Sequence, residues 1–148
     1  MEKLLPEQII VQIREVFAQL QNPVQVLLFV TKSDCEGCET TEQLLSEVAE
    51  LSEKISLSVH DIDQEPELAS LYKVQGKAPA IVIAARDGER ISDYGIRYLG
   101  IPSGHEFNTL IQDFLLVSGR DSGLTQQTRA FIKGLTKPLH LQVFVTPT

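Results

Sequence analysis

The chain has 148 residues, of which 43% are hydrophobic and 22% charged, a balance typical of one ordinary globular domain or of one domain and part of another. Its 13 Lys and Arg residues against 20 Asp and Glu residues give a net charge of -7, which disfavours nucleic acids and anionic membranes as partners. No apolar run has the length of a membrane helix or a signal peptide, so we expect a soluble, cytoplasmic protein.

Two elements are predicted ahead of the cysteines. Apolar residues recur at helical spacing over residues 6–20, with Pro6 in the first turn, and Asn22-Pro23 interrupts that pattern. Residues 24–30 are almost all aliphatic or β-branched, which is typical of a strand buried on both faces. The sequence therefore predicts an N-terminal helix, followed by a strand that ends shortly before Cys35.

Three further elements are predicted up to residue 76. Apolar positions over 44–55 indicate an amphipathic helix, and the polar–apolar alternation of 56–62 indicates a strand. Glu65-Pro66 begins a third helix, and Gly76 ends it because glycine readily adopts a left-handed backbone. The apolar face of this helix is expected to consist of Leu68, Leu71 and Tyr72.

A hairpin and a fourth helix follow. Residues 80–85 and 90–98 read as antiparallel strands, because the Asp87-Gly88 pair between them is a strong hairpin signal. Ser103 and Glu106 have the spacing of a capping box ahead of a helix that continues to residue 117. This order predicts an α/β fold in three layers around a mixed four-stranded sheet, and it resembles the layout of thioredoxins and glutaredoxins. We assign this thioredoxin-like unit, with its added N-terminal helix, to residues 1–119.

The last part of the chain, residues 120–148, repeats the beginning at an offset of 115 residues. The repeated motifs are Leu20-x-x-Pro23 with Leu135-x-x-Pro138, and Phe29-Val30-Thr31 with Phe144-Val145-Thr146. We therefore expect a helix over 124–135 and a strand over 139–145, which would begin a truncated second unit, although coincidence between two short segments is the alternative. Such a strand lacks its partners, so we expect it to pack on its own unit or to pair with a second chain.

The only two cysteines, Cys35 and Cys38, are the candidates for chemistry. A bond between them closes too small a loop to stabilise a fold, and one pair cannot complete a zinc site. At a strand-to-helix corner we expect Cys35 in the first helical turn, where backbone N–H groups and the helix dipole lower the pKa of a thiol. Cys35 is thus predicted to be the nucleophile and Cys38 the resolving thiol. Two buried, inert cysteines and a metal site shared across a dimer are the alternatives.

Two neighbouring features bear on how the dithiol would work. Asp34, Glu36 and Glu39 disfavour a thiolate nearby, which predicts a reducing pair, unless these carboxylates only stabilise the helix N-terminus. Ala78-Pro79 stands just before a strand, either as a trans proline that begins an edge strand or as a cis bond that turns Ala78 toward the thiols.

A longer pattern resembles one family. The residues Ile96-Arg97-Tyr98-Leu99-Gly100-Ile101-Pro102-Ser103-Gly104-His105-Glu106-Phe107 and the ending Phe144-Val145-Thr146-Pro147-Thr148 resemble the N-terminal unit of the glutaredoxin-like protein disulfide oxidoreductases, which hold two thioredoxin folds in tandem. In that family a second C-x-x-C follows the ending motif, so we expect the second site to be absent here.

The resemblance implies a protein thiol–disulfide oxidoreductase that reduces protein disulfides, or alternatively forms or isomerises them. It implies a cis Pro79 and substrate-binding roles for Ala78, Pro79, Glu36 and Gly37. Its expected partners are protein disulfides and a thioredoxin-reductase-like electron donor, and no cofactor or metal is expected beyond the Cys35–Cys38 disulfide. The nearest competitor is the N-terminal domain of the flavoprotein component of alkyl hydroperoxide reductase, which would imply an electron relay to a partner enzyme. A scaffold with a vestigial dithiol is the remaining hypothesis.

Overall fold

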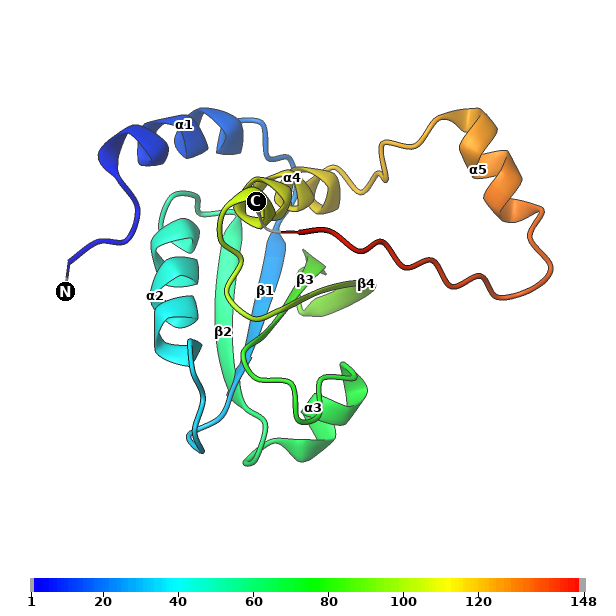
Figure 1. Cartoon of the computed structure of the whole chain (residues 1–148). Coiled ribbons are helices and arrows are strands. Elements are labelled where there is room, and N and C mark those ends of the chain that lie inside the picture. The colour runs from blue at the N-terminus through cyan, green and yellow to red at the C-terminus, as the bar shows by residue number, and fades with distance from the viewer. Residues whose placement is uncertain (1, 147–148) are drawn as a thin grey trace.

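One mixed β-sheet lies between helices in this computed structural model, which describes residues 2–146 (Figure 1). Pro147 and Thr148, the end of the motif that resembles the tandem family, lie outside the described residues. The elements in chain order are α1 (Glu7–Phe17), β1 (Val24–Val30), α2 (Cys38–Ala49), β2 (Ile55–Asp61), α3 (Pro66–Leu71), β3 (Ala80–Asp87), β4 (Arg90–Leu99), α4 (His105–Ser118) and α5 (Gln126–Lys133).

The four strands lie in the order β2-β1-β3-β4. β1 and β2 are parallel because α2 crosses over between them, whereas β3 is antiparallel to both β1 and β4. The predicted hairpin is present, but its two-residue turn is Gly88-Glu89 rather than Asp87-Gly88, because Asp87 still pairs with Arg90 at the end of β3. The thioredoxin-like α/β fold with a mixed four-stranded sheet is thereby confirmed.

Alternate side chains of β1 enter two separate hydrophobic cores. Val24, Val26 and Leu28 pack with residues of α1, α2 and α4, whereas Leu27 and Phe29 pack against α3 and the segment that follows it. This two-sided burial explains why the sequence of β1 is almost continuously apolar. The added N-terminal helix is anchored in the larger core, where the rings of Phe17 and Phe114 meet at 5.8 Å.

Three predicted helix boundaries are wrong. The helix predicted over 44–55 ends at Ala49, and Ile55 is the first residue of β2. Gly104, with φ +61°, occupies the N-cap of α4 and has no side chain to offer, so Ser103 and Glu106 form no capping box. α3 ends at Leu71 rather than at Gly76, because Lys73 already adopts the left-handed conformation, with φ +57°. The side chain of Leu71 is 70% exposed, so it does not belong to the apolar face of that helix.

The last described segment matches the prediction only in part. Its helix is present as α5, but residues 139–145 form no strand, and their apolar side chains are 63–89% exposed. After α5 the segment turns back toward the centre of the view as an extended trace (Figure 1), yet its apolar side chains stay exposed. The expectation that it packs on its own unit is therefore wrong, and pairing with a second chain stays a prediction. A strand needs a neighbour to accept its backbone hydrogen bonds, and apolar sequence alone does not supply one. The boundary of a second unit at residue 120 stays a prediction.

Among residues 2–146, no helix combines the length and the apolar character that crossing a membrane requires.

Candidate active site

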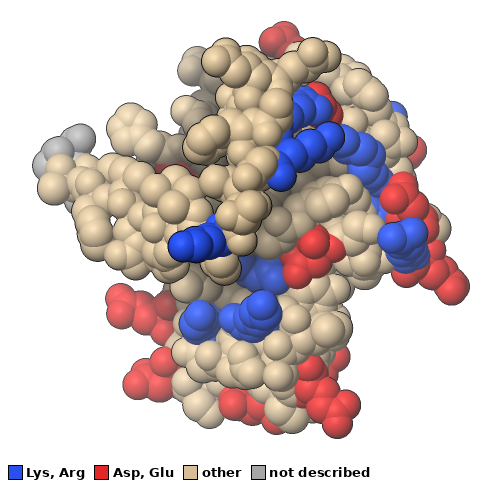
Figure 2. Space-filling model, turned by 90° about the vertical axis from the view of Figure 1, so that its right-hand side faces the viewer, with Lys and Arg blue, Asp and Glu red and all other residues tan. Residues whose placement is uncertain are grey.

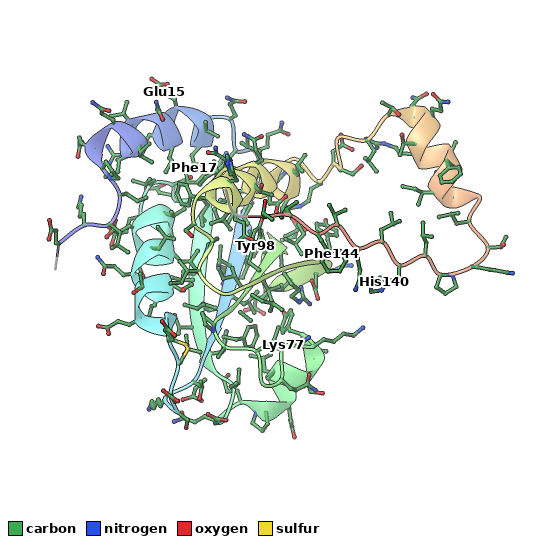
Figure 3. All side chains as sticks on the ribbon, viewed as in Figure 1. Glu15, Phe17, Lys77, Tyr98, His140 and Phe144 are labelled. Carbon is green, nitrogen blue, oxygen red and sulfur yellow. A yellow bond between two sulfur atoms is a disulfide. The ribbon has the colours of Figure 1, made fainter. Side chains whose placement is uncertain are left out.

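Cys35 and Cys38 form a disulfide at the lower end of α2 (Figure 3), with 5.6 Å between their Cα atoms. Cys38 is the first residue of α2 and is only 8% exposed, whereas Cys35 precedes the helix and is half-buried. The prediction that Cys35 lies in the first helical turn is therefore wrong. Its sulfur nevertheless lies beside the N-terminus of α2, because it is bonded to the sulfur of Cys38.

Gly37 is the reason why α2 begins at Cys38. Its φ of +90° belongs to the left-handed region, which turns the chain just before the helix, and its carbonyl oxygen accepts the N–H of Thr41 at 2.9 Å. A Cβ atom at this position would lie 2.9 Å from Cδ1 of Ile101 and 3.0 Å from Cγ1. The side chain of Ile101 therefore packs directly on the backbone between the two cysteines.

The Ala78–Pro79 peptide bond is cis, as the resemblance implied. β3 begins at the next residue, Ala80, which pairs with Phe29 near the end of β1. The carbonyl oxygen of Pro79 accepts the N–H of Gly100 at 2.8 Å. Pro79 thus lies at the end of the sheet from which the cysteine loop leaves, and it also fixes the segment that carries Ile101.

Three separate segments therefore meet at the end of the sheet that carries the disulfide: the loop after β1, the cis-proline segment before β3 and the segment after β4. The first two segments were predicted to form the site, whereas Ile101 was not. An isoleucine between Gly100 and Pro102 in a connecting segment was an available signal, since it remains 38% exposed outside any helix or strand. The arrangement leaves Cys35 partly exposed to a client, with the apolar side chain of Ile101 packed on the turn between the cysteines.

Acidic side chains from two loops lie at this end of the sheet. Asp34, Glu36 and Glu39 are exposed around the cysteines. Thr31 donates its hydroxyl to a carboxylate oxygen of Asp63 at 2.5 Å, which joins the loop after β1 to the loop after β2. Within residues 2–146, no group of three or more His, Cys, Asp or Glu side chains is arranged to hold a metal ion.

Two hydrogen-bonded pairs of the hairpin serve the fold. Tyr98 donates its hydroxyl to Asp113 at 2.5 Å, and burial together with this carboxylate raises the pKa of Tyr98 far above its ordinary value. Arg97 forms two hydrogen bonds to Asp93, at 2.9 and 2.6 Å, and this pairing lowers the pKa of the Asp93 carboxyl despite its partial burial. These pairs fix β4 to α4 and stabilise the bulged part of β4.

Sequence relatives of the chain are the F components of alkyl hydroperoxide reductases. The protein from Staphylococcus epidermidis is 31% identical over 140 residues, a match that covers 88% of this chain and 24% of that protein. The chain thus spans about a quarter of the length of the curated relatives that it matches. No family model matches the chain.

Solved structures of two kinds resemble the chain over most of its length. The F component of the alkyl hydroperoxide reductase from Enterococcus faecalis is 32% identical, with a TM-score of 0.79 over 91% of this chain and 62% of that one. A protein disulfide oxidoreductase from Aeropyrum pernix is 31% identical, with a TM-score of 0.73 over 88% of this chain and 55% of that one. Both likenesses agree with the thioredoxin-like fold of the chain.

Proposed function

We propose that the chain is a protein thiol–disulfide oxidoreductase whose reacting groups are the sulfurs of Cys35 and Cys38. The observation that carries this proposal is the unequal burial of the bonded pair, because Cys35 is partly exposed whereas Cys38 is buried at the start of α2. The likeness to the protein disulfide oxidoreductase from Aeropyrum pernix supports the same reaction.

The reaction begins with the reduced dithiol. The Cys35 thiolate attacks one sulfur of a client disulfide, so that a mixed disulfide forms and the other client sulfur leaves as a thiolate, which takes up a proton. Cys38 then loses its proton and attacks the Cys35 sulfur, which releases the second client thiol and forms the Cys35–Cys38 disulfide. The client gains two electrons, and an external dithiol or a thioredoxin-reductase-like donor returns the pair to its reduced form.

The surrounding residues would bind the client. An extended client segment would lie along Ala78 and the cis Pro79, next to the Glu36-Gly37 turn, with Ile101 as an apolar contact. Pro79 is itself buried, so its contribution is the path of the backbone rather than its ring surface. Client-binding roles for the other residues are proposals that mutagenesis would test at Ala78, Glu36, Gly37 and Ile101.

A second candidate function is electron relay to a peroxide-reducing partner. It is favoured by the relatives, which are components of alkyl hydroperoxide reductases. Both functions use the same dithiol, but they differ in the acceptor. A relay domain would pass electrons to a purified peroxide reductase much faster than to a protein disulfide such as insulin.

Insulin reduction by dithiothreitol tests the proposed function. The wild-type protein should accelerate insulin precipitation, whereas Cys35→Ser should not accelerate it above the rate with dithiothreitol alone. Circular dichroism of both proteins checks that the substitution leaves the fold intact. Equal acceleration by wild type and Cys35→Ser, or acceleration by neither, would remove the support for a catalytic dithiol and leave the scaffold hypothesis.

A further inference from the structure

We infer that this site prefers cationic clients, in which the disulfide is flanked by Lys or Arg side chains; the inference rests on the proposed function and names its class of substrate. Two observations carry it: the distribution of charge, and the partial exposure both of Cys35 and of Ile101, which packs on Gly37 between the two cysteines.

The net negative charge of the chain is concentrated around the dithiol. Segments 31–39 and 61–67 together carry seven carboxylates and one lysine, so they account for six of the seven net negative charges. Figure 2 shows acidic side chains around the lower end of the molecule, the end where Figure 1 places the loops after β1 and β2. The rest of the chain is nearly neutral.

The two segments are neighbours in space. Val30 and Asp61 are paired at the ends of the parallel strands β1 and β2, and the N–H of Ile62 donates to the carbonyl oxygen of Val30 at 2.9 Å. The bond from Thr31 to Asp63 continues this contact beyond the strands. The carboxylates of both loops therefore act on a client that approaches Cys35.

The three carboxylates closest to the dithiol in the chain are free to meet a client. Asp34, Glu36 and Glu39 are exposed, and no ion pair among residues 2–146 uses any of them. Screening in physiological salt reaches about 8 Å, which leaves charges on residues next to a reacting cysteine within range. Focused charge of one sign raises association rates by roughly 10- to 1,000-fold for an oppositely charged ligand at low salt.

Three small disulfides of different charge test the preference: cystamine is cationic, 2-hydroxyethyl disulfide is neutral and 3,3′-dithiodipropionate is anionic. The fully reduced protein is mixed with each, and the rate of Cys35 oxidation is followed by acid quenching and mass spectrometry. Dividing each rate by that of the same disulfide with dithiothreitol removes the intrinsic difference in leaving groups.

The normalised rate with cystamine should exceed that with dithiodipropionate by about tenfold or more at low salt, and the ratio should fall to within about twofold in 1 M salt. Glu39→Lys should reduce the low-salt ratio by about threefold. Glu15→Lys makes the same charge change on α1, far from the disulfide in Figure 3, and should leave the ratio unchanged.

Equal normalised rates, or a ratio that does not depend on salt, would overturn the client preference while the exchange activity itself remained. Equal effects of Glu39→Lys and Glu15→Lys would also overturn it, because they would show that total charge rather than the local charge decides. No oxidation by any of the three disulfides would refute the proposed function, and the preference would fall with it.

Discussion

Gly37→Ala is the substitution that tests the geometry of the site most sharply. At a φ of +90°, a residue with a Cβ atom costs about 1–2 kcal/mol relative to glycine. The new methyl group would also lie 2.9 Å from Cδ1 of Ile101, and moving that side chain away from its rotamer costs about 1 kcal/mol. The free energy of unfolding of the oxidised protein should therefore fall by about 2–3 kcal/mol.

Urea unfolding followed by circular dichroism, with the disulfide intact, measures this loss. The same substitution in an Ile101→Ala background isolates the contact, because the strain at residue 37 remains while the clash disappears. The cost of Gly37→Ala should then drop by about 1 kcal/mol. A loss below about 0.5 kcal/mol, or an equal loss in both backgrounds, would refute this account of the contact between Gly37 and Ile101.

Three further predictions concern the rest of the molecule. Ser118 is fully buried and bonds three backbone groups of residues 21–22, at 2.7–3.0 Å, so Ser118→Ala should lower the free energy of unfolding in urea by about 2–4 kcal/mol; an unchanged midpoint would contradict this. Burial alone would raise the pKa of Glu47, but hydrogen bonds from the backbone N–H groups of residues 4–5 lower it overall. The resulting stabilisation is present above the ordinary glutamate pKa of about 4.3 and is lost as the pH falls through the lower, folded-state value, so hydrogen exchange should show residues 4–5 losing protection there, and Glu47→Gln should abolish that pH dependence. The exposed apolar segment 139–145 predicts association of the chain at raised concentration, which light scattering would detect; a monomer at every concentration would contradict it.

The sheet could be predicted from the sequence because each strand has a strong local signal. The predicted range 24–30 coincides with β1, since Pro23 precedes a run that two cores then bury. The predictions failed where the conformation depends on more than the local sequence pattern. Ser103 cannot cap α4 because Gly104 occupies the N-cap, and residues 139–145 have the composition of a strand without a neighbouring strand to pair with.

The parts of the site that depend on short stretches of sequence could be predicted, whereas the parts that depend on tertiary contacts could not. Cys35, Cys38 and the cis Pro79 follow from short motifs and a family resemblance, and the structure has the disulfide and the cis bond. The contact of Ile101 with Gly37 could not be predicted, because Ile101 reaches Gly37 only through the pairing of β3 with β4 and the bond between Gly100 and Pro79. The start of α2 also depends on the left-handed backbone of Gly37, which the spacing of apolar residues does not indicate.

Trapping of the mixed disulfide tests the central claim most directly. The Cys38→Ser variant is reduced and then mixed with native, disulfide-bonded insulin. It cannot complete the second step, so a covalent adduct should accumulate, and mass spectrometry should locate it on Cys35. The Cys35→Ser variant should form little adduct, because its remaining thiol is buried at the start of α2. No adduct with Cys38→Ser, or a faster adduct through Cys38, would contradict the assignment of Cys35 as the attacking thiol.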